Sequence, residues 1–295
     1  MAGEPLQDRQ VPFTIPARDA RGRVVRLEGV LGEILAAHDY PAPLKQLLAE
    51  ALVLTALMGA LLKDDDSQMT LQIQSEKGAV DLLVCDYLSG ALRGYLRHDA
   101  AAFAALGEAP SLGAIFPGGY LAITFDLATT DQRYQGIIPI EGESLATVCE
   151  TYFSQSEQVP TLIRLGVDCA ASPPVAGGLL VQHLPEGEEG RARLHVELEH
   201  PHWQHVAALA GSMSAAELAD RSLSEEDLLW RLFHEEAEVR VLPAARLVKG
   251  CRCTAAYYQS VLARFPAAEI DAMRDEAGHI SVDCAFCSKQ FAINI

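Results

Sequence analysis

Two closely spaced cysteine pairs near the C-terminal end constrain the fold of this chain more than any other feature of its sequence. Cys251 and Cys253 are separated by one residue, and Cys284 and Cys287 by two, whereas the other three of the seven cysteines are scattered through the preceding sequence. Close pairs of this kind are typical of a metal or redox site. Because four thiolates about 2.3 Å from one Zn²⁺ form a closed tetrahedral shell, the two pairs predict a zinc site.

The spacing of the pairs differs from that of a generic zinc ribbon. Residues 254–283 form an unusually long insert between them, and the first pair is C-x-C rather than C-x-x-C. Paired disulfides or unrelated surface thiols are therefore alternatives to zinc, and His279 is an alternative ligand near the second pair. A catalytic zinc normally keeps an open position and has histidine or carboxylate ligands, so four cysteines argue against a zinc enzyme.

The residues between and after the pairs predict a small unit that depends on the metal. Thr254 is placed to cap a helix, Pro266 to open a second one, and Gly278 to end it. The first helix should pack through an apolar face made of Tyr258, Val261, Leu262 and Phe265. The second should pack through Ile270 and Met273. Alternating residues at 280–284 and 291–295 predict two strands around the second pair. So small a unit buries too little apolar surface to fold alone, and structural zinc supplies on the order of 10 to 16 kcal/mol.

Charge and composition limit the cellular compartments and the classes of partner that we expect. The chain has 295 residues, a net charge of −17 and ordinary globular composition. An acidic field repels phosphate backbones, so we expect no nucleic-acid partner. The N-terminal sequence lacks a secretory signal, and the longest apolar run, residues 51–62, is too short to span a bilayer. We therefore expect a cytoplasmic protein without a membrane partner, in a reducing compartment where cysteine pairs favour metal or redox chemistry.

Residues 1–182 predict an α+β core domain in which sheets surround a buried central helix. Residues 44–62 are apolar on nearly every side, which is typical of a buried helix. Alternation at 69–73 and 121–125 predicts half-buried strands of an antiparallel or mixed sheet. Leu145, Val148, Cys149 and Tyr152 should form one face of another helix. The glycine pairs at 118–119 and 177–178 are interpreted as turns.

Residues 183–238 predict an acidic helical linker, followed by a zinc-binding redox-switch domain over residues 239–295. The loop-like segment 186–190 is a plausible boundary, and the sequences SAAE (214–217) and SEED (224–227) resemble capping boxes. The second box opens a helix with Leu228, Leu229, Leu232 and Phe233 on one side and Trp230 beside them. The segment has no core of its own, so it must pack on its neighbours. An ordinary connecting helical hairpin is the plainer alternative.

The remaining candidate residues argue against catalysis. Cys85, Cys149 and Cys169 fall on apolar strands or helices and are expected to be inert core thiols. His234, Glu235 and Glu236 are interpreted as solvated charges at a helix end rather than acid and base groups. The sequence has no phosphate-binding loop, dinucleotide fingerprint, zinc-protease motif or nucleophile elbow. We expect no enzymatic activity and no nucleotide.

The cysteine pairs and three separated segments resemble the 33-kilodalton heat-shock protein family, which are redox-regulated bacterial holdase chaperones. The segments are YQGIIPIEGE (134–143), YFSQSE (152–157) and LWRLFHEE (229–236). The resemblance runs from about residue 10 to the end of the chain. Several motifs in the same order make it far more specific than the cysteines alone.

The resemblance implies a mechanism. Members of the family are inactive when reduced and loaded with one zinc ion per chain. Peroxide with heat, or hypochlorous acid, oxidises the ligands, zinc leaves, the linker unfolds, and exposed apolar surface binds unfolding client proteins without ATP. Carried onto this chain, Cys251, Cys253, Cys284 and Cys287 are the ligands, and disulfides join Cys251 to Cys253 and Cys284 to Cys287. Activated members form homodimers.

Two other functions compete with this interpretation. A zinc-ribbon adaptor would use a purely structural zinc and would bind a folded partner only while the metal is present. A disulfide oxidoreductase would use Cys284 and Cys287, but no thioredoxin-like βαβ pattern surrounds that pair. The adaptor and the holdase differ in one property, because the holdase works only after zinc is lost.

Overall fold

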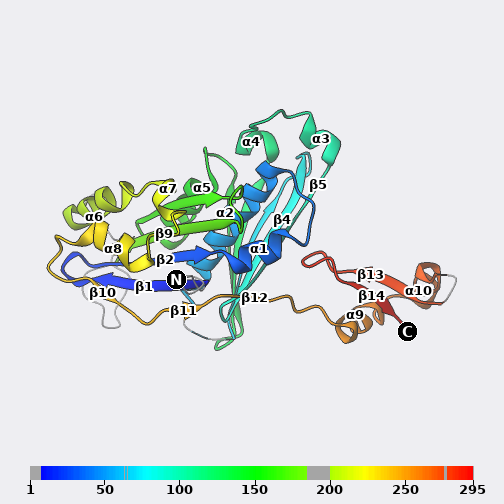
Figure 1. Ribbon diagram of the computed structural model, residues 1–295. Helices are drawn as coiled ribbons and strands as arrows, with labels where there is room; N and C mark the ends of the chain where they lie inside the picture. Colours follow the sequence, from blue (N-terminus) through cyan, green and yellow to red (C-terminus); the bar gives the residue numbers. More distant parts are fainter. Residues whose placement is uncertain (1–7, 63, 65, 185–199, 276–277, 295) are drawn as a thin grey trace, which may run out of the picture.

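The computed structural model describes residues 8–62, 64, 66–184, 200–275 and 278–294. Two six-stranded sheets enclose a long helix, and a small third unit lies at the C-terminal end (Figure 1). The predicted α+β class, with sheets around a buried central helix, is confirmed. The predicted loop at 186–190 lies outside the described residues.

The first sheet is antiparallel and brings the start of the chain next to residues far along it. Its strand order is β10-β1-β2-β9-β8, and β11 also pairs with β1. The strands are β1 (Arg9–Ile15), β2 (Ala20–Leu27), β8 (Thr161–Asp168), β9 (Val175–His183), β10 (Arg240–Val241) and β11 (Ala245–Arg246). Every residue of β9 is buried, because both faces of the sheet are covered.

The second sheet has the order β12-β5-β4-β3-β6-β7, in which β12 runs parallel to β5 and the other pairs are antiparallel. Its strands are β3 (Gln68–Gln74), β4 (Val80–Leu88), β5 (Ala91–His98), β6 (Tyr120–Leu127), β7 (Gln132–Pro139) and β12 (Val248–Lys249). Met69, Leu71 and Ile73 are buried and alternate with partly exposed residues, as predicted for a half-buried strand.

Helix α2 (Ala42–Gly59) lies between the two sheets and contacts strands of both. It is long and apolar enough to cross a membrane by length and composition, but 72% of it is buried inside the protein. It is therefore the core helix that the sequence predicted. The other helical segments of the body are α1 (Gly29–Leu35), α3 (Ala100–Ala104), α4 (Leu112–Ile115), α5 (Leu145–Tyr152) and the short turns Pro16–Arg18 and Phe153–Glu157. The predicted buried face of α5 is confirmed.

The glycine pair 177–178 was predicted as a turn, and this prediction is wrong. Both glycines lie within β9, where neighbours press on the strand from both sides. A Cβ atom on Gly177 would lie 2.2 Å from the Leu218 carbonyl oxygen, and one on Gly178 would lie 2.4 Å from Val53 of α2. Glycine is required here because the strand is packed too closely for a side chain.

Three helices, α6 (Pro201–Gly211), α7 (Ala215–Leu218) and α8 (Glu225–Phe233), cover the outer face of the first sheet. Both predicted capping boxes are present, at Ser214–Glu217 and Ser224–Asp227. One apolar cluster joins side chains from these helices to the sheet, and its sheet members are Val11, Phe13, Ile15, Ala20, Val24, Leu179 and Val181. The helices therefore pack on their neighbours, as expected of a segment without its own core. Trp230 is not part of this contact and is 68% exposed.

After α8 the chain crosses the body as an extended segment, residues 240–250, which we call the strap. It contributes β10 and β11 to the edge of the first sheet and β12 to the edge of the second (Figure 1). Cys251 follows the strap directly.

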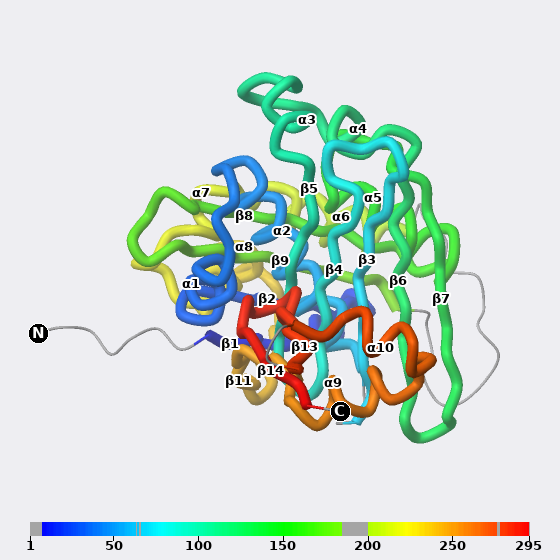
Figure 2. Tube along the Cα trace, turned by 90° about the vertical axis from the view of Figure 1, so that its right-hand side faces the viewer, coloured from blue at the N-terminus to red at the C-terminus, as the bar shows by residue number. Residues whose placement is uncertain are grey.

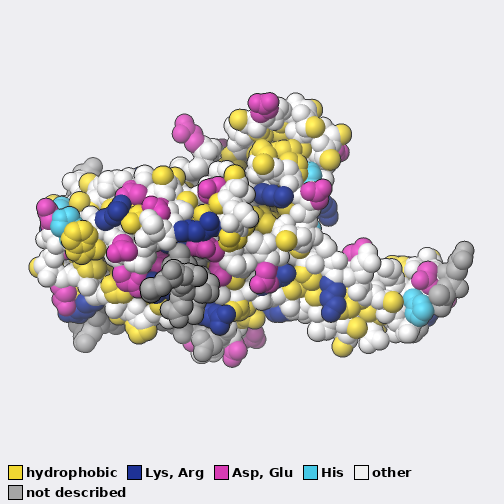
Figure 3. Space-filling view, viewed as in Figure 1, with side chains coloured by type: hydrophobic (Ala, Val, Ile, Leu, Met, Phe, Trp, Pro, Cys, Tyr) yellow, Lys and Arg dark blue, Asp and Glu magenta, His cyan; other side chains and the backbone are white. Residues whose placement is uncertain are grey.

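The C-terminal unit contains α9 (Ala255–Leu262), α10 (Ala267–Met273) and the hairpin β13 (Ile280–Asp283) and β14 (Gln290–Ile293). Thr254 caps α9 as predicted. The predicted apolar faces are too long, because α9 ends at Leu262 and both Phe265 and Met273 are exposed. Helix α10 ends at Met273, so Gly278 belongs to the turn before β13 and does not end the helix. The unit projects from the body as a narrow arm (Figure 3).

Substituting Gly177 should test the close packing of α7 on β9. We expect Gly177→Ala to lower the free energy of unfolding by about 1 to 3 kcal/mol, because the new methyl group meets a backbone oxygen that cannot move alone. Urea denaturation measures this change. Gly113→Ala is the matched control, since a Cβ there meets nothing within 4 Å, and it should change stability by less than about 1 kcal/mol. Equal effects of the two substitutions would contradict the packing argument.

Candidate metal centre

The four cysteines of the two predicted pairs meet at the base of the C-terminal unit. Their sulfur atoms all lie within 4.8 Å of one another, and the described part of the chain offers one group of this kind. The Sγ–Sγ distances are 3.3 Å for Cys251–Cys253 and 3.5 Å for both Cys251–Cys284 and Cys253–Cys287. A tetrahedron with metal–sulfur bonds of about 2.3 Å has edges of about 3.8 Å. The four thiols are therefore arranged to hold a metal ion.

Two short backbone segments present the four sulfur atoms. The first pair follows β12, whose end is tied to the second sheet where the Gly250 N–H donates to the Leu92 carbonyl at 2.7 Å. The second pair lies in the turn between β13 and β14. There the Cys284 N–H donates to the Lys289 carbonyl at 2.9 Å, and the Ser288 N–H donates to the Cys284 carbonyl at 2.8 Å. One half of the centre is thus fixed to the body and the other to the C-terminal hairpin.

Among the four cysteines, the surroundings favour the thiolate form of Cys284. Burial opposes ionisation of Cys284, but hydrogen bonds from the Tyr258 hydroxyl and from the backbone of Cys287 and Phe286 outweigh it and lower the pKa of this thiol to about 6. Burial raises the pKa of Cys251 and Cys253, and hydrogen bonds with the neighbouring thiols raise that of Cys253 further. A bound cation supplies the charge that allows four thiolates to coexist.

Arg252, the residue between the first two cysteines, anchors the centre to the second sheet. Its guanidinium donates to the Asp86 carboxylate at 3.1 Å and to the Gln68 side chain at 2.8 Å. Asp86 is 4% exposed, and it also accepts hydrogen bonds from Arg93 at 2.7 Å and from Thr70 at 2.8 Å. A buried carboxylate with several charged donors loses much of its stabilisation when one donor is removed.

Phe286, between the second two cysteines, makes the matching contact from the hairpin. Its ring lies 4.0 Å below the Arg93 guanidinium and 4.8 Å from the Tyr95 ring, edge to face. The Ser288 hydroxyl donates to the Ala37 carbonyl at 2.6 Å. Both cysteine pairs therefore carry a contact to the body, and the C-terminal unit lies in front of β3, β4 and β5 in Figure 2.

The sequence did not identify Arg252, Asp86 or Phe286 as part of this site. Arg252 is 166 residues from Asp86, and Phe286 is farther still, so no local pattern joins them. One signal was available, because Asp86 is an acid in the middle of the apolar strand β4 and a buried carboxylate requires a partner.

The other predicted thiols lie outside the centre. Cys85 and Cys149 are fully buried, as expected for core thiols, and burial raises the pKa of Cys149 to about 12. Cys169 lies just beyond β8, where it is partly buried and packs against the edge of the central core, so its predicted place in the core is confirmed only in part. Desolvation raises its pKa to about 11, which keeps it protonated near neutral pH. His279 is not among the four clustered ligands.

The interpretation of Glu236 as a solvated charge is also wrong. Its side chain is 4% exposed and accepts hydrogen bonds from Arg18 at 2.9 Å and His205 at 2.7 Å. Although burial opposes ionisation, these two partners lower the pKa of Glu236. His234 instead contacts the Trp230 carbonyl at the end of α8. Glu236 therefore helps to hold the end of the helical segment on the body.

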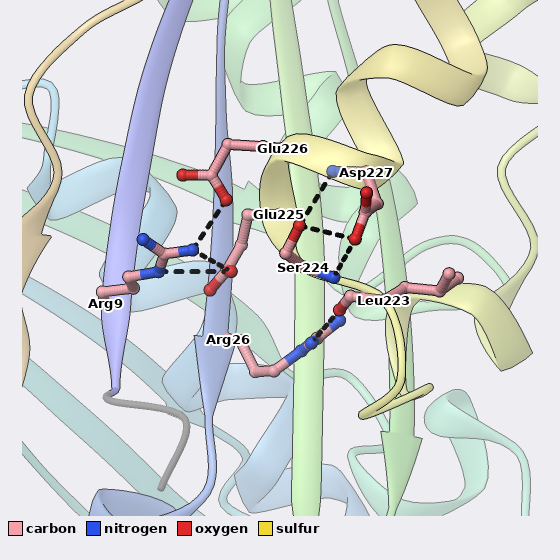
Figure 4. Close-up of polar contacts among 7 residues, drawn as sticks. All are labelled: Arg9, Arg26, Leu223, Ser224, Glu225, Glu226 and Asp227. Carbon is pink, nitrogen blue, oxygen red and sulfur yellow. Dashed lines mark hydrogen bonds and ion pairs between the residues drawn. The ribbon is translucent and has the colours of Figure 1, made fainter. Parts of the chain in front are cut away.

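Helix α8 is held on the first sheet by buried polar contacts at its start (Figure 4). Arg9 of β1 bonds to Glu225 at 2.8 Å and to Glu226 at 2.7 Å, and the Glu225 residue is 1% exposed. Arg26 of β2 donates to the carbonyl of Leu223, and Ser224 caps the helix. Charged contacts therefore position α8 over the apolar side chains of the first sheet. Removing α8 would expose these apolar side chains and would leave Arg9 and Arg26 without their partners at the start of the helix.

Comparison with known proteins agrees with this arrangement. A family model described as Hsp33 protein matches residues 8–294. The 33 kDa chaperonin of Caulobacter vibrioides is 39% identical over 98% of this chain and 95% of the relative. The 33 kDa chaperonin of Pseudomonas paraeruginosa is 36% identical over 96% of this chain and 91% of the relative.

A solved structure shares the fold. The crystal structure of the 33 kDa chaperonin (heat shock protein 33 homolog) from Thermotoga maritima superposes with a TM-score of 0.79 at 22% identity. The match covers 97% of this chain and 95% of the other.

Replacing one thiol should separate a metal ligand from a bystander. We expect Cys253→Ser to weaken metal binding by more than about tenfold and to make the C-terminal unit sensitive to protease in reductant, because this small unit relies on ligation for its fold. Bound zinc and the rate of proteolysis measure the two effects. Cys169→Ser is the matched control and should change neither. Full zinc stoichiometry with unchanged protease resistance would remove Cys253 from the ligand set.

Proposed function

Because this chain belongs to the Hsp33 family of chaperones, we propose that it is an ATP-independent holdase that is switched on by oxidation. In this proposal the reduced form holds one Zn²⁺ through Cys251, Cys253, Cys284 and Cys287 and does not bind clients. Oxidation joins Cys251 to Cys253 and Cys284 to Cys287. Each pair of thiolates gives two electrons to one molecule of peroxide, which takes up two protons and becomes water, and the zinc ion is released.

The thiol geometry supports the sensing half of the proposal. The sulfur atoms of Cys251 and Cys253 lie 3.3 Å apart, and those of Cys284 and Cys287 lie within 4.8 Å. The thiolate is the form of cysteine that reacts with oxidants, and hydrogen bonds from Tyr258 and the backbone lower the pKa of Cys284 to about 6. A disulfide within C-x-C closes a very small ring, which favours ready reduction and therefore a reversible switch.

The observation that carries the proposal is the apolar face beneath α6, α7 and α8. Seven buried apolar side chains of the first sheet face these helices, and three of them, Val11, Phe13 and Ile15, line β1 alone. Loss of the helices would expose a contiguous apolar surface of the kind that binds other polypeptides. Helix α8 ends at Phe233, so residues 234–250, which include the strap, connect the helices to Cys251 and the sensor.

The proposal assigns a role to each part of the chain. Residues 1–182 are the core that presents the client surface, residues 183–238 are the linker that covers it, and residues 239–295 are the redox switch. The partners are unfolding client proteins and, after oxidation, a second copy of the chain. We place the protein in the cytoplasm, without nucleotide or nucleic-acid ligands, as a non-enzymatic component of the oxidative stress response.

A light-scattering assay tests the switch. A thermally aggregating test protein is mixed with this chain, either reduced and zinc-loaded or treated with peroxide at elevated temperature, while a chromogenic chelator follows zinc release. We expect aggregation to be suppressed only by the treated protein, in step with zinc release. Equal activity of both forms, or none, would contradict the switch and favour an adaptor with a structural zinc.

A further inference from the structure

The strap covers one free edge of each large sheet. Arg240 and Val241 pair with β1, and so do Ala245 and Arg246, all antiparallel to it. Val248 and Lys249 then pair with β5, in the parallel direction. Eleven residues thus protect two edges that would otherwise present unpaired N–H and C=O groups. The opposite edges of the two sheets are formed by β7 and β8, which do not pair with the strap. Displacement of the strap would therefore free only the edges at β1 and β5.

The strap is held mainly by its backbone. Besides the hydrogen bonds within the strand pairings, four of its N–H groups donate to the body: Leu242 to Pro12 O at 2.8 Å, Leu247 to Asp8 O at 2.8 Å, Val248 to Gly90 O at 2.9 Å, and Gly250 to Leu92 O at 2.7 Å. Among residues 240–250, all of which the structure describes, Leu247 alone has a buried side chain. Even its large apolar residues are exposed, with Val241 at 46%, Leu242 at 43% and Val248 at 40%.

A ligand bound in this way is recognised with little regard to its sequence. Strand addition to a sheet edge takes its affinity from main-chain hydrogen bonds, which every non-proline residue offers. Lys249 donates from Nζ to the Glu33 carbonyl at 3.2 Å, but most other side chains of the strap face solvent, so another extended segment could replace it with the loss of little besides this contact. One apolar residue in the position of Leu247 is the main requirement, because that side chain joins the central core.

We propose that the edges of β1 and β5 are binding sites for extended backbone segments of unfolded polypeptides, and that the strap occupies these sites as an internal competitor. This inference rests on the proposed holdase function and adds a second mode of client binding to the apolar face. The two edges differ in the length they offer. Leu96 of β5 already exchanges hydrogen bonds with the Tyr40 hydroxyl, at 2.8 and 3.1 Å, so β5 offers only its first residues. β1 offers a longer edge, from which one N–H is missing at Pro12.

The position of the strap explains how the sites would open. Its last residue precedes Cys251, and Arg252 and Phe286 are the contacts that hold the cysteine centre on the second sheet. If that centre comes apart, the strap loses its anchored end and is held by its backbone hydrogen bonds and by Leu247. Pairings of two residues each are then easily displaced.

Proline substitutions test the role of the strap backbone. The double variant Leu242→Pro and Val248→Pro removes the N–H groups that donate to the Pro12 and Gly90 carbonyls, at residues whose side chains are exposed. We expect this variant to suppress client aggregation in reductant while it retains zinc. The matched control, Leu242→Ala with Val248→Ala, removes the same side chains but keeps both N–H groups and should stay inactive until oxidised. Circular dichroism and bound zinc confirm that each variant is folded.

A peptide of residues 240–250 tests the edges directly in both the proline variant and the oxidised wild-type protein. We expect the labelled peptide to bind and to displace a bound client. The same peptide methylated on the backbone nitrogens of Leu242 and Val248 should bind at least about tenfold more weakly, because two hydrogen bonds are lost. The reduced wild-type protein should bind neither peptide, since its own strap occupies the sites.

Each result separates this inference from the proposed function. If the oxidised protein holds clients but neither peptide binds or competes, the edges are not client sites and the holdase proposal stands. If the peptide separates a dimer without displacing client, the edges join two copies of the chain and the inference is wrong. If the peptides bind with the expected difference but no client is held, the edge sites stand and the holdase function fails.

Discussion

The C-terminal unit has too small an apolar core to fold without other support. The proposed link between the four thiols and the helices that cover the first sheet depends on this constraint. Its core consists of four buried apolar residues, Leu262, Ile270, Ile280 and Ile293, with three partly buried neighbours. Structural zinc supplies on the order of 10 to 16 kcal/mol in small units that fold around it. We therefore propose that the arm is folded when its four thiolates hold a metal ion and unfolded when they do not.

The arm is joined to the body by contacts of Arg252, Phe286 and Ser288 and by one extended segment. Asp86 holds Arg252 of the first cysteine pair and Arg93, and Arg93 in turn covers Phe286 of the second pair. The strap continues from this point across the edges of both sheets to α8, whose first turn is fixed by Glu225 and Arg9. None of these segments has a large core of its own, so each depends on its neighbour, and a change at the thiols has a continuous path to the helices over the first sheet.

Local sequence patterns predicted many of the helices and strands, but they did not predict the contacts between segments that are far apart in the sequence. The buried helix α2, the capping boxes at Ser214 and Ser224 and the strands around the second cysteine pair follow from periodicity and turn residues, which act over a few positions. Gly177 was wrongly predicted to lie in a turn because it belongs to a glycine pair. Glycine is needed there because Leu218 approaches closely, and Leu218 is 41 residues later in the chain, outside any local pattern. The pairing of Arg252 with Asp86 and the two-sheet course of the strap were missed for the same reason. The convergence of the four cysteines was predictable because metal chemistry, rather than chain proximity, requires it.

Amide hydrogen exchange of the strap tests the central claim most directly. The account predicts that the N–H groups of Leu242 and Val248 are protected in the reduced, zinc-loaded protein and lose protection together when zinc is removed by a chelator. The amides of α2 should remain protected in both states, because that helix belongs to the central core. Protection of the strap that is unchanged after zinc removal would contradict the claim that the metal centre controls the covering of the sheets.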